Sequence, residues 1–76
     1  MKERGWHYVQ PENGLPIYFW VEDPSQAIQQ YRIRTGRRSF PRLIRRLDDQ
    51  ESVQLEQRII SYGLSLNLAK AKGFRD

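Results

Sequence analysis

Two short stretches near the N-terminus are rich in β-branched and aromatic residues. They cover residues 6–10 (Trp-His-Tyr-Val-Gln) and 16–22 (Pro-Ile-Tyr-Phe-Trp-Val-Glu), with Asn13-Gly14 midway between them. An Asn-Gly pair between two such stretches is the strongest short-range signal for a β-hairpin. The pattern therefore predicts a two-stranded antiparallel hairpin whose turn consists of Asn13 and Gly14.

Both faces of this hairpin are expected to carry large rings. The predicted turn makes paired positions sum to 27, so one face holds the pairs Tyr8–Phe19 and Trp6–Val21, and the other holds His7–Trp20 and Val9–Tyr18. Pro11 and Pro16 leave this register open, and a shift by one residue exchanges the members of the faces but leaves both aromatic. A single packed layer covers only one face, so we expect the second to meet a partner, another strand or solvent.

Start and stop signals for helices follow the hairpin. Asp23-Pro24 has the form of an N-cap followed by proline at the first helical position, and Gly36 is a stop signal, so we predict a helix over 24–35. Its buried stripe would include Ala27, Ile28 and Tyr31. The alternation of residues 31–35 leaves a strand there as an alternative.

Three further segments are predicted to be helical. The first begins near Pro41 and places Leu43, Ile44 and Leu47 inward and Arg42, Arg45 and Arg46 outward in one stripe. The second covers about residues 49–62, with Asp48 and Glu51 as a capping pair and Gly63 as its stop. The third runs from a cap at Ser65 through Lys72, and a strand over 64–68 is its alternative.

These signals predict one small α+β domain over residues 1–76. An N-terminal two-stranded antiparallel β-hairpin (about 5–22) would be followed by three to four short α-helices (about 24–73). The chain has no cysteine and one histidine, which excludes a disulfide framework and a typical zinc site, and we expect no metal and no cofactor. Extra stability would have to come from a partner or from oligomerisation, for example as a homodimer.

We expect a cytoplasmic protein without a membrane partner. The longest apolar run, Ile17–Val21, has five residues, whereas a membrane-spanning helix needs roughly 20. The first residues, Met-Lys-Glu-Arg, lack the apolar stretch of a signal peptide.

Positive charge is concentrated in one segment. Seven of the thirteen Lys and Arg residues lie between Arg32 and Arg46, and no acidic residue occurs from Pro24 to Leu47. Guanidinium groups match the geometry of phosphates and carboxylates. We therefore predict that this segment contacts nucleic-acid phosphates through Arg32, Arg34, Arg37, Arg38, Arg42, Arg45 and Arg46. An acidic protein partner, or a solvated face paired with nearby carboxylates, are the alternatives.

Two other features could add selectivity for nucleic acid. The joint of residues 62–65 has the outline of a helix-turn-helix, in which Ser65, Asn67, Lys70 and Lys72 would face a groove. An ordinary helical hairpin is the alternative, and Arg58 falls where the first helix normally carries an apolar residue. The rings of the hairpin could also stack on single-stranded bases through Trp6, Tyr8, Tyr18 and Trp20, unless they form the core.

Catalysis has little support in the sequence. His7 is the only histidine, the acidic pairs lie where helix caps are needed, and the glycines are scattered. We therefore expect a small non-enzymatic nucleic-acid-binding protein, such as a DNA-binding regulatory protein. The alternative is a protein-interaction module, for example an inhibitor or accessory subunit that docks an aromatic and arginine surface containing Tyr18, Trp20 and Phe40 on an acidic partner.

Overall fold

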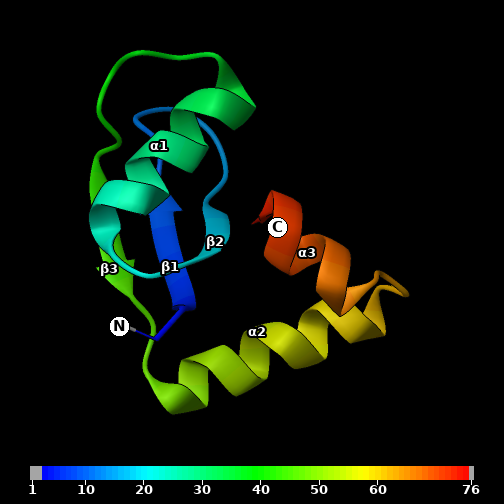
Figure 1. Ribbon diagram of the computed structural model, residues 1–76. Helices are drawn as coiled ribbons and strands as arrows, with labels where there is room; N and C mark the ends of the chain where they lie inside the picture. The colour runs from blue at the N-terminus through cyan, green and yellow to red at the C-terminus, as the bar shows by residue number, and fades with distance from the viewer. Residues whose placement is uncertain (1–2, 76) are drawn as a thin grey trace.

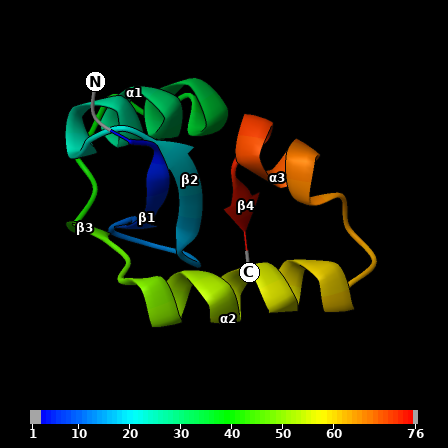
Figure 2. The same cartoon turned by 60° about the horizontal axis from the view of Figure 1, so that its bottom comes forward.

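The chain folds into a four-stranded antiparallel sheet with helices on both faces. The computed structural model describes residues 3–75. In chain order the elements are β1 (Gly5–Gln10), β2 (Ile17–Val21), α1 (Pro24–Thr35), β3 (Leu43–Arg46), α2 (Asp49–Ser61), α3 (Leu66–Lys72) and β4 (Phe74–Arg75) (Figure 1). The strand order is β3-β1-β2-β4. Figure 2 shows α1 above the sheet and α2 below it. The α+β class is therefore confirmed, with more strands than the hairpin alone.

The hairpin forms, but its predicted turn and register are wrong by one residue. Trp6 pairs with Trp20 and Tyr8 with Tyr18, and the last pair before the loop is Val9 with Ile17. Residues 11–16 form the connection. Proline has no N–H to donate to a strand partner, so Pro16 cannot extend the ladder towards the Asn-Gly pair.

This shift sorts the side chains of the hairpin into two buried clusters. Trp6 and Tyr18 pack with residues of α2, α3 and β4, namely Leu55, Ile59, Ala69 and Phe74. On the opposite face, Val9, Ile17, Phe19 and Val21 pack with Ala27 and Tyr31 of α1. Helices thus cover both faces of the hairpin. The expectation that one face would meet a partner, another strand or solvent is therefore wrong.

The helices with clear capping signals form where they were predicted. Asp23 caps α1 by accepting a hydrogen bond from the Gln26 N–H at 2.9 Å, and Gly36 ends it in the left-handed conformation. Asp48 and Glu51 form the expected capping box of α2. Ser65 caps α3 through the Leu68 N–H. The strand alternatives for residues 31–35 and 64–68 are not adopted.

The predicted helix from Pro41 is wrong, because residues 43–46 form strand β3. This strand pairs with β1, with Arg45 opposite Tyr8 and Arg46 opposite His7. Hydrogen bonds to a strand more than thirty residues earlier outweigh the local helical pattern, as tertiary context often does. Side chains alternate between the faces of a strand. Arg45 and Arg46 therefore point to opposite sides of the sheet instead of forming one stripe.

Candidate nucleic-acid interface

The arginine-rich segment follows one side of the molecule. It leaves the last turn of α1, crosses the connection of residues 36–42 and enters β3, which is an edge strand of the sheet (Figure 1). Its arginines come from three kinds of local structure and have different surroundings.

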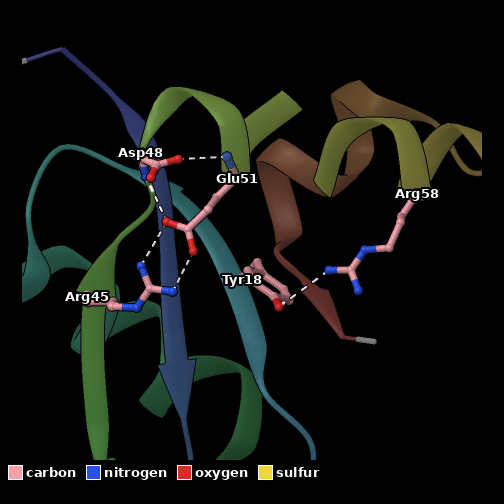
Figure 3. A network of polar contacts seen from close by, with 5 residues as sticks. All are labelled: Tyr18, Arg45, Asp48, Glu51 and Arg58. Atoms are coloured by element: carbon pink, nitrogen blue, oxygen red, sulfur yellow. Dashed lines mark hydrogen bonds and ion pairs between the residues drawn. The ribbon is translucent and has the colours of Figure 1, made fainter. Parts of the chain in front are cut away.

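The two arginines of β3 are engaged within the fold. Arg45 forms a two-pronged ion pair with Glu51, with N–O distances of 2.9 and 2.6 Å (Figure 3). The hydrogen bond from Arg45, followed by that from the Asp48 N–H, lowers the pKa of Glu51 to about 2. Arg46 donates to the backbone oxygens of Glu22 and Glu3. Charged side chains on an edge strand also disfavour pairing with other chains.

Arg34 links α1 to the junction of α3 and β4. Its guanidinium donates to the backbone oxygens of Lys72 at 3.0 Å and Gly73 at 2.8 Å. Partial burial, and then the positive charge of Arg75, lower the pKa of Arg34. The fold therefore holds two cations close together at this junction.

Three arginines line one surface hollow: Arg34 and Arg37 come from the end of α1 and the residues just after it, and Arg75 comes from β4. We call it the arginine hollow; its lining residues are Pro11, Asn13, Tyr31, Arg34, Thr35, Arg37 and Arg75. It lies where the β1–β2 connection, the last turn of α1 and β4 meet. Among residues 3–75, no carboxylate lines it. The described lining thus offers several cationic donors and no carboxylate to neutralise them.

Further arginines extend from the hollow along the connection to β3. Within residues 3–75, the side chains of Arg37, Arg38 and Arg42 have neither a hydrogen bond nor an ion pair, and all three are exposed. Arg32 lies over the ring of Phe40, 4.8 Å from its centroid. Phe40 is 69% exposed. The exposed ring of Phe40 therefore has a cation over one face, and the hollow beside it is lined by Phe40, Arg42 and the acidic Glu12.

The hairpin rings that were candidates for base stacking lie beneath helices. Tyr18 is only 8% exposed, and its hydroxyl accepts a hydrogen bond from Arg58 at 3.4 Å (Figure 3). Trp20 is half-buried, with the Lys70 ammonium 4.3 Å from its ring centroid. Trp6 is fully buried and donates through Nε1 to Glu56 at 2.9 Å. These rings form core and not an open stacking surface.

The residues of the predicted helix-turn-helix do not share one outward face. Lys70 turns towards the sheet, where it contacts Trp20 and lies 3.8 Å from the Glu56 carboxylate. Asn67 and Lys72 are exposed, and Ser65 caps the helix. The arrangement corresponds to the helical-hairpin alternative, in which α3 packs on the sheet through Ala69.

Sequence reasoning missed Asn13 and Arg75 as members of the candidate site. Arg75 is an isolated cation beyond the last predicted helix. It reaches the hollow only because β4 pairs with β2, with Arg75 opposite Ile17. No local signal could have indicated this contact.

In the described part of the chain, no three or more His, Cys, Asp or Glu side chains gather as a metal site. No helix within residues 3–75 is long and apolar enough to cross a membrane. Comparison with protein families, curated proteins and solved structures finds no significant similarity to this chain.

Proposed function

We propose that this protein is a small non-enzymatic nucleic-acid-binding protein that holds phosphates in the arginine hollow. The observation that carries the proposal is the convergence of Arg34, Arg37 and Arg75 on one hollow, whose lining within residues 3–75 holds no carboxylate. Phosphate oxygens accept strong, charge-assisted hydrogen bonds from guanidinium groups, and such contacts supply most of the affinity in backbone recognition.

The electrostatics of the hollow support an anionic ligand. Like charges held near one another repel, and the lowered pKa of Arg34 reflects in part the charge of Arg75. A bound phosphate would relieve this repulsion and could also accept a hydrogen bond from the Asn13 amide, which lines the same hollow. The repulsion between Arg34 and Arg75 in the free protein would therefore favour binding of an anion.

The neighbouring connection supports a single-stranded nucleic acid over a duplex. Arg38 and Arg42 flank the exposed ring of Phe40 along the chain. Proteins that bind single strands combine a basic track for the backbone with aromatic rings on which bases stack. In this proposal the strand runs from the hollow onto the connection, and one base stacks on Phe40.

A salt titration tests the proposal directly. We expect fluorescence anisotropy to show binding to single-stranded DNA or RNA that is tighter than binding to duplex DNA of the same length. Five phosphate contacts to a single strand would give a log-log salt dependence of about −3.5, since each contributes about −0.7. Absence of binding to every oligonucleotide at low salt would overturn the proposal.

A pair of charge-matched variants locates the contact. Arg37→Ala should flatten the salt dependence by about 0.7, because it removes one phosphate contact. Arg4→Ala removes the same charge just before β1, at the end of that strand away from the β1–β2 connection, and should leave the slope unchanged. Equal effects of the two substitutions would show that only net charge matters and that the hollow is not the site.

The protein-interaction alternative needs a different surface from the one first expected. Tyr18 is buried and Trp20 is covered by Lys70, so they cannot form an aromatic docking patch together with Phe40. An exposed apolar surface lies between α1 and α3 and adjoins the arginine hollow, with which it shares Arg34 and Arg75.

A further inference from the structure

An open apolar groove of about 620 Å³ lies between α1 and α3, with β4 contributing to its lining. We call it the α1–α3 groove, and its apolar lining residues are Ile33, Leu64, Leu68, Ala69, Ala71 and Phe74. Three large aliphatic side chains are unusually open to solvent there, since Ile33 is 76%, Leu64 49% and Leu68 58% exposed. Contiguous exposed apolar surface of this kind marks interaction sites in soluble proteins.

The charged residues that the structure describes in the groove lining are all positive. They are Arg34, Lys72 and Arg75, and no carboxylate from residues 3–75 lines the groove. Arg34 is held in place by its hydrogen bonds to the Lys72 and Gly73 oxygens. A complementary ligand would therefore combine an apolar strip with flanking negative charge.

We propose that the α1–α3 groove binds an acidic amphipathic helix of a partner protein. A helix that lies in a groove packs residues spaced i, i+3, i+4 and i+7 against its floor. Here those residues would cover Leu64, Leu68 and Ile33, while flanking Glu or Asp side chains would meet the cationic rim. This site goes beyond phosphate binding because its largest contribution comes from aliphatic side chains.

Other occupants fit the groove less well. A small ligand confined to the floor would leave the protruding Ile33 uncovered, although the volume is within the roughly 300–1,000 Å³ of ligand sites. A second copy related by two-fold symmetry would bring the cationic rims together, because such an interface uses the same patch on both subunits. A nucleic-acid strand would satisfy the cations but leave the aliphatic side chains against a polar backbone.

The test uses three synthetic helical peptides and the full chain labelled with ¹⁵N. The first peptide carries leucine on one face and glutamate on the other, the second replaces glutamate with lysine, and the third replaces leucine with serine. We expect the first to bind at least about tenfold more tightly than either control, because both apolar contact and charge complementarity are required. Amide shifts should concentrate in the last turn of α1 and in α3.

Matched substitutions assign the binding to the groove. Ile33→Glu and the neutral Ile33→Ser should each weaken binding of the first peptide, the former by about tenfold or more. Val53→Glu and Val53→Ser are the controls, because Val53 is 54% exposed on α2 and does not line the groove. Since Ile33 and Val53 are both exposed, circular dichroism should report folded protein for all four variants.

Several outcomes would overturn this inference. Equal binding of the serine peptide would mean that charge alone is recognised, and equal binding of the lysine peptide would mean that charge is irrelevant. Equal losses of peptide affinity for Ile33→Glu and Val53→Glu would show that the peptide does not bind in the groove. Absence of any binding of the first peptide would also overturn the inference. Binding of oligonucleotides to Ile33→Ser should remain unchanged, which separates a failure of this site from a failure of the arginine hollow.

Discussion

His7 is a buried polar residue in the middle of the sheet. Its side chain has no exposed surface, and its Nδ1 lies 3.0 Å from the Gly5 backbone oxygen. Nε2 has no hydrogen-bond partner within residues 3–75. The pKa of His7 lies below its usual value of 6.5, and burial is the largest cause. The hydrogen bond with the Gly5 carbonyl opposes this effect, and the nearby charge of Arg46 lowers the pKa further. The neutral ring is therefore the form that the fold accommodates.

This burial predicts a loss of stability in mild acid. Below pH 6.5 the unfolded chain binds a proton at His7 more readily than the folded chain does, so the free energy of unfolding should decrease as pH falls from 6.5 towards the folded pKa. Urea denaturation at pH 7.5 and pH 5.5 measures the difference. His7→Phe, which cannot titrate, should show a smaller decrease. The same decrease in both proteins would assign the acid sensitivity to other groups.

At the scale of elements, local signals and long-range pairing differ in how well sequence reveals them. The caps of α1 and α2 are contained in a few neighbouring residues, so Asp23, Asp48 and Glu51 predicted both helix starts correctly. Strand β3 was missed because its pairing with β1 spans more than thirty residues and its own sequence also permits a helix. Strand β4, Phe74–Arg75, has only two residues, too few for any periodicity.

The entry into β4 depends on Gly73 for two separate reasons. Its backbone has φ 86° and ψ 164°, a region that is essentially restricted to glycine. A Cβ atom there would also lie 2.7 Å from the ring of Phe19 and 3.0 Å from the backbone oxygen of Tyr18. Gly36 also has positive φ, but a Cβ atom there would meet nothing within 4 Å.

These two glycines provide a matched comparison. Gly36→Ala should lower the free energy of unfolding by about 1 kcal/mol, because only backbone strain is added. Gly73→Ala should cost about 3 kcal/mol or more, because it adds strain and a clash with the core. Urea denaturation with a common m-value measures both. Similar losses would mean that β4 shifts easily and contributes little to the sheet.

At the scale of the whole molecule, the sequence indicated the basic segment but not which of its cations are available to a ligand. Arg45 and Arg46 were expected beside Arg42 in one stripe, yet the strand geometry directs them into contacts within the fold. Arg34 and Arg37 do lie together, with Arg75 completing their hollow from the far end of the chain. The basic segment can be read directly from the sequence. The meeting of Arg34 and Arg37 with Arg75 depends on the order of the strands in the sheet, which no local sequence pattern predicts.

The two buried clusters draw on different parts of the chain, and this affects how the molecule opens. The buried members of the cluster beneath α1 all come from residues 9–31, whereas the other cluster requires Leu55, Ile59, Ala69 and Phe74. A unit built from nearby residues has little loop-closure entropy to overcome. We therefore predict a partly unfolded state in which the hairpin and α1 stay folded while α2, α3 and β4 have detached.

Native-state hydrogen exchange should detect this state. We expect amides of α1 and of the β1–β2 pairs to exchange more slowly than those of α3 and β4, with α2 following α3 as one cooperative unit. A single exchange free energy across all elements would contradict this order. Since α3 forms one wall of the α1–α3 groove, each such opening would abolish the groove. A ligand bound in the groove would therefore stabilise the closed form, and amides throughout the C-terminal third of the chain would exchange more slowly.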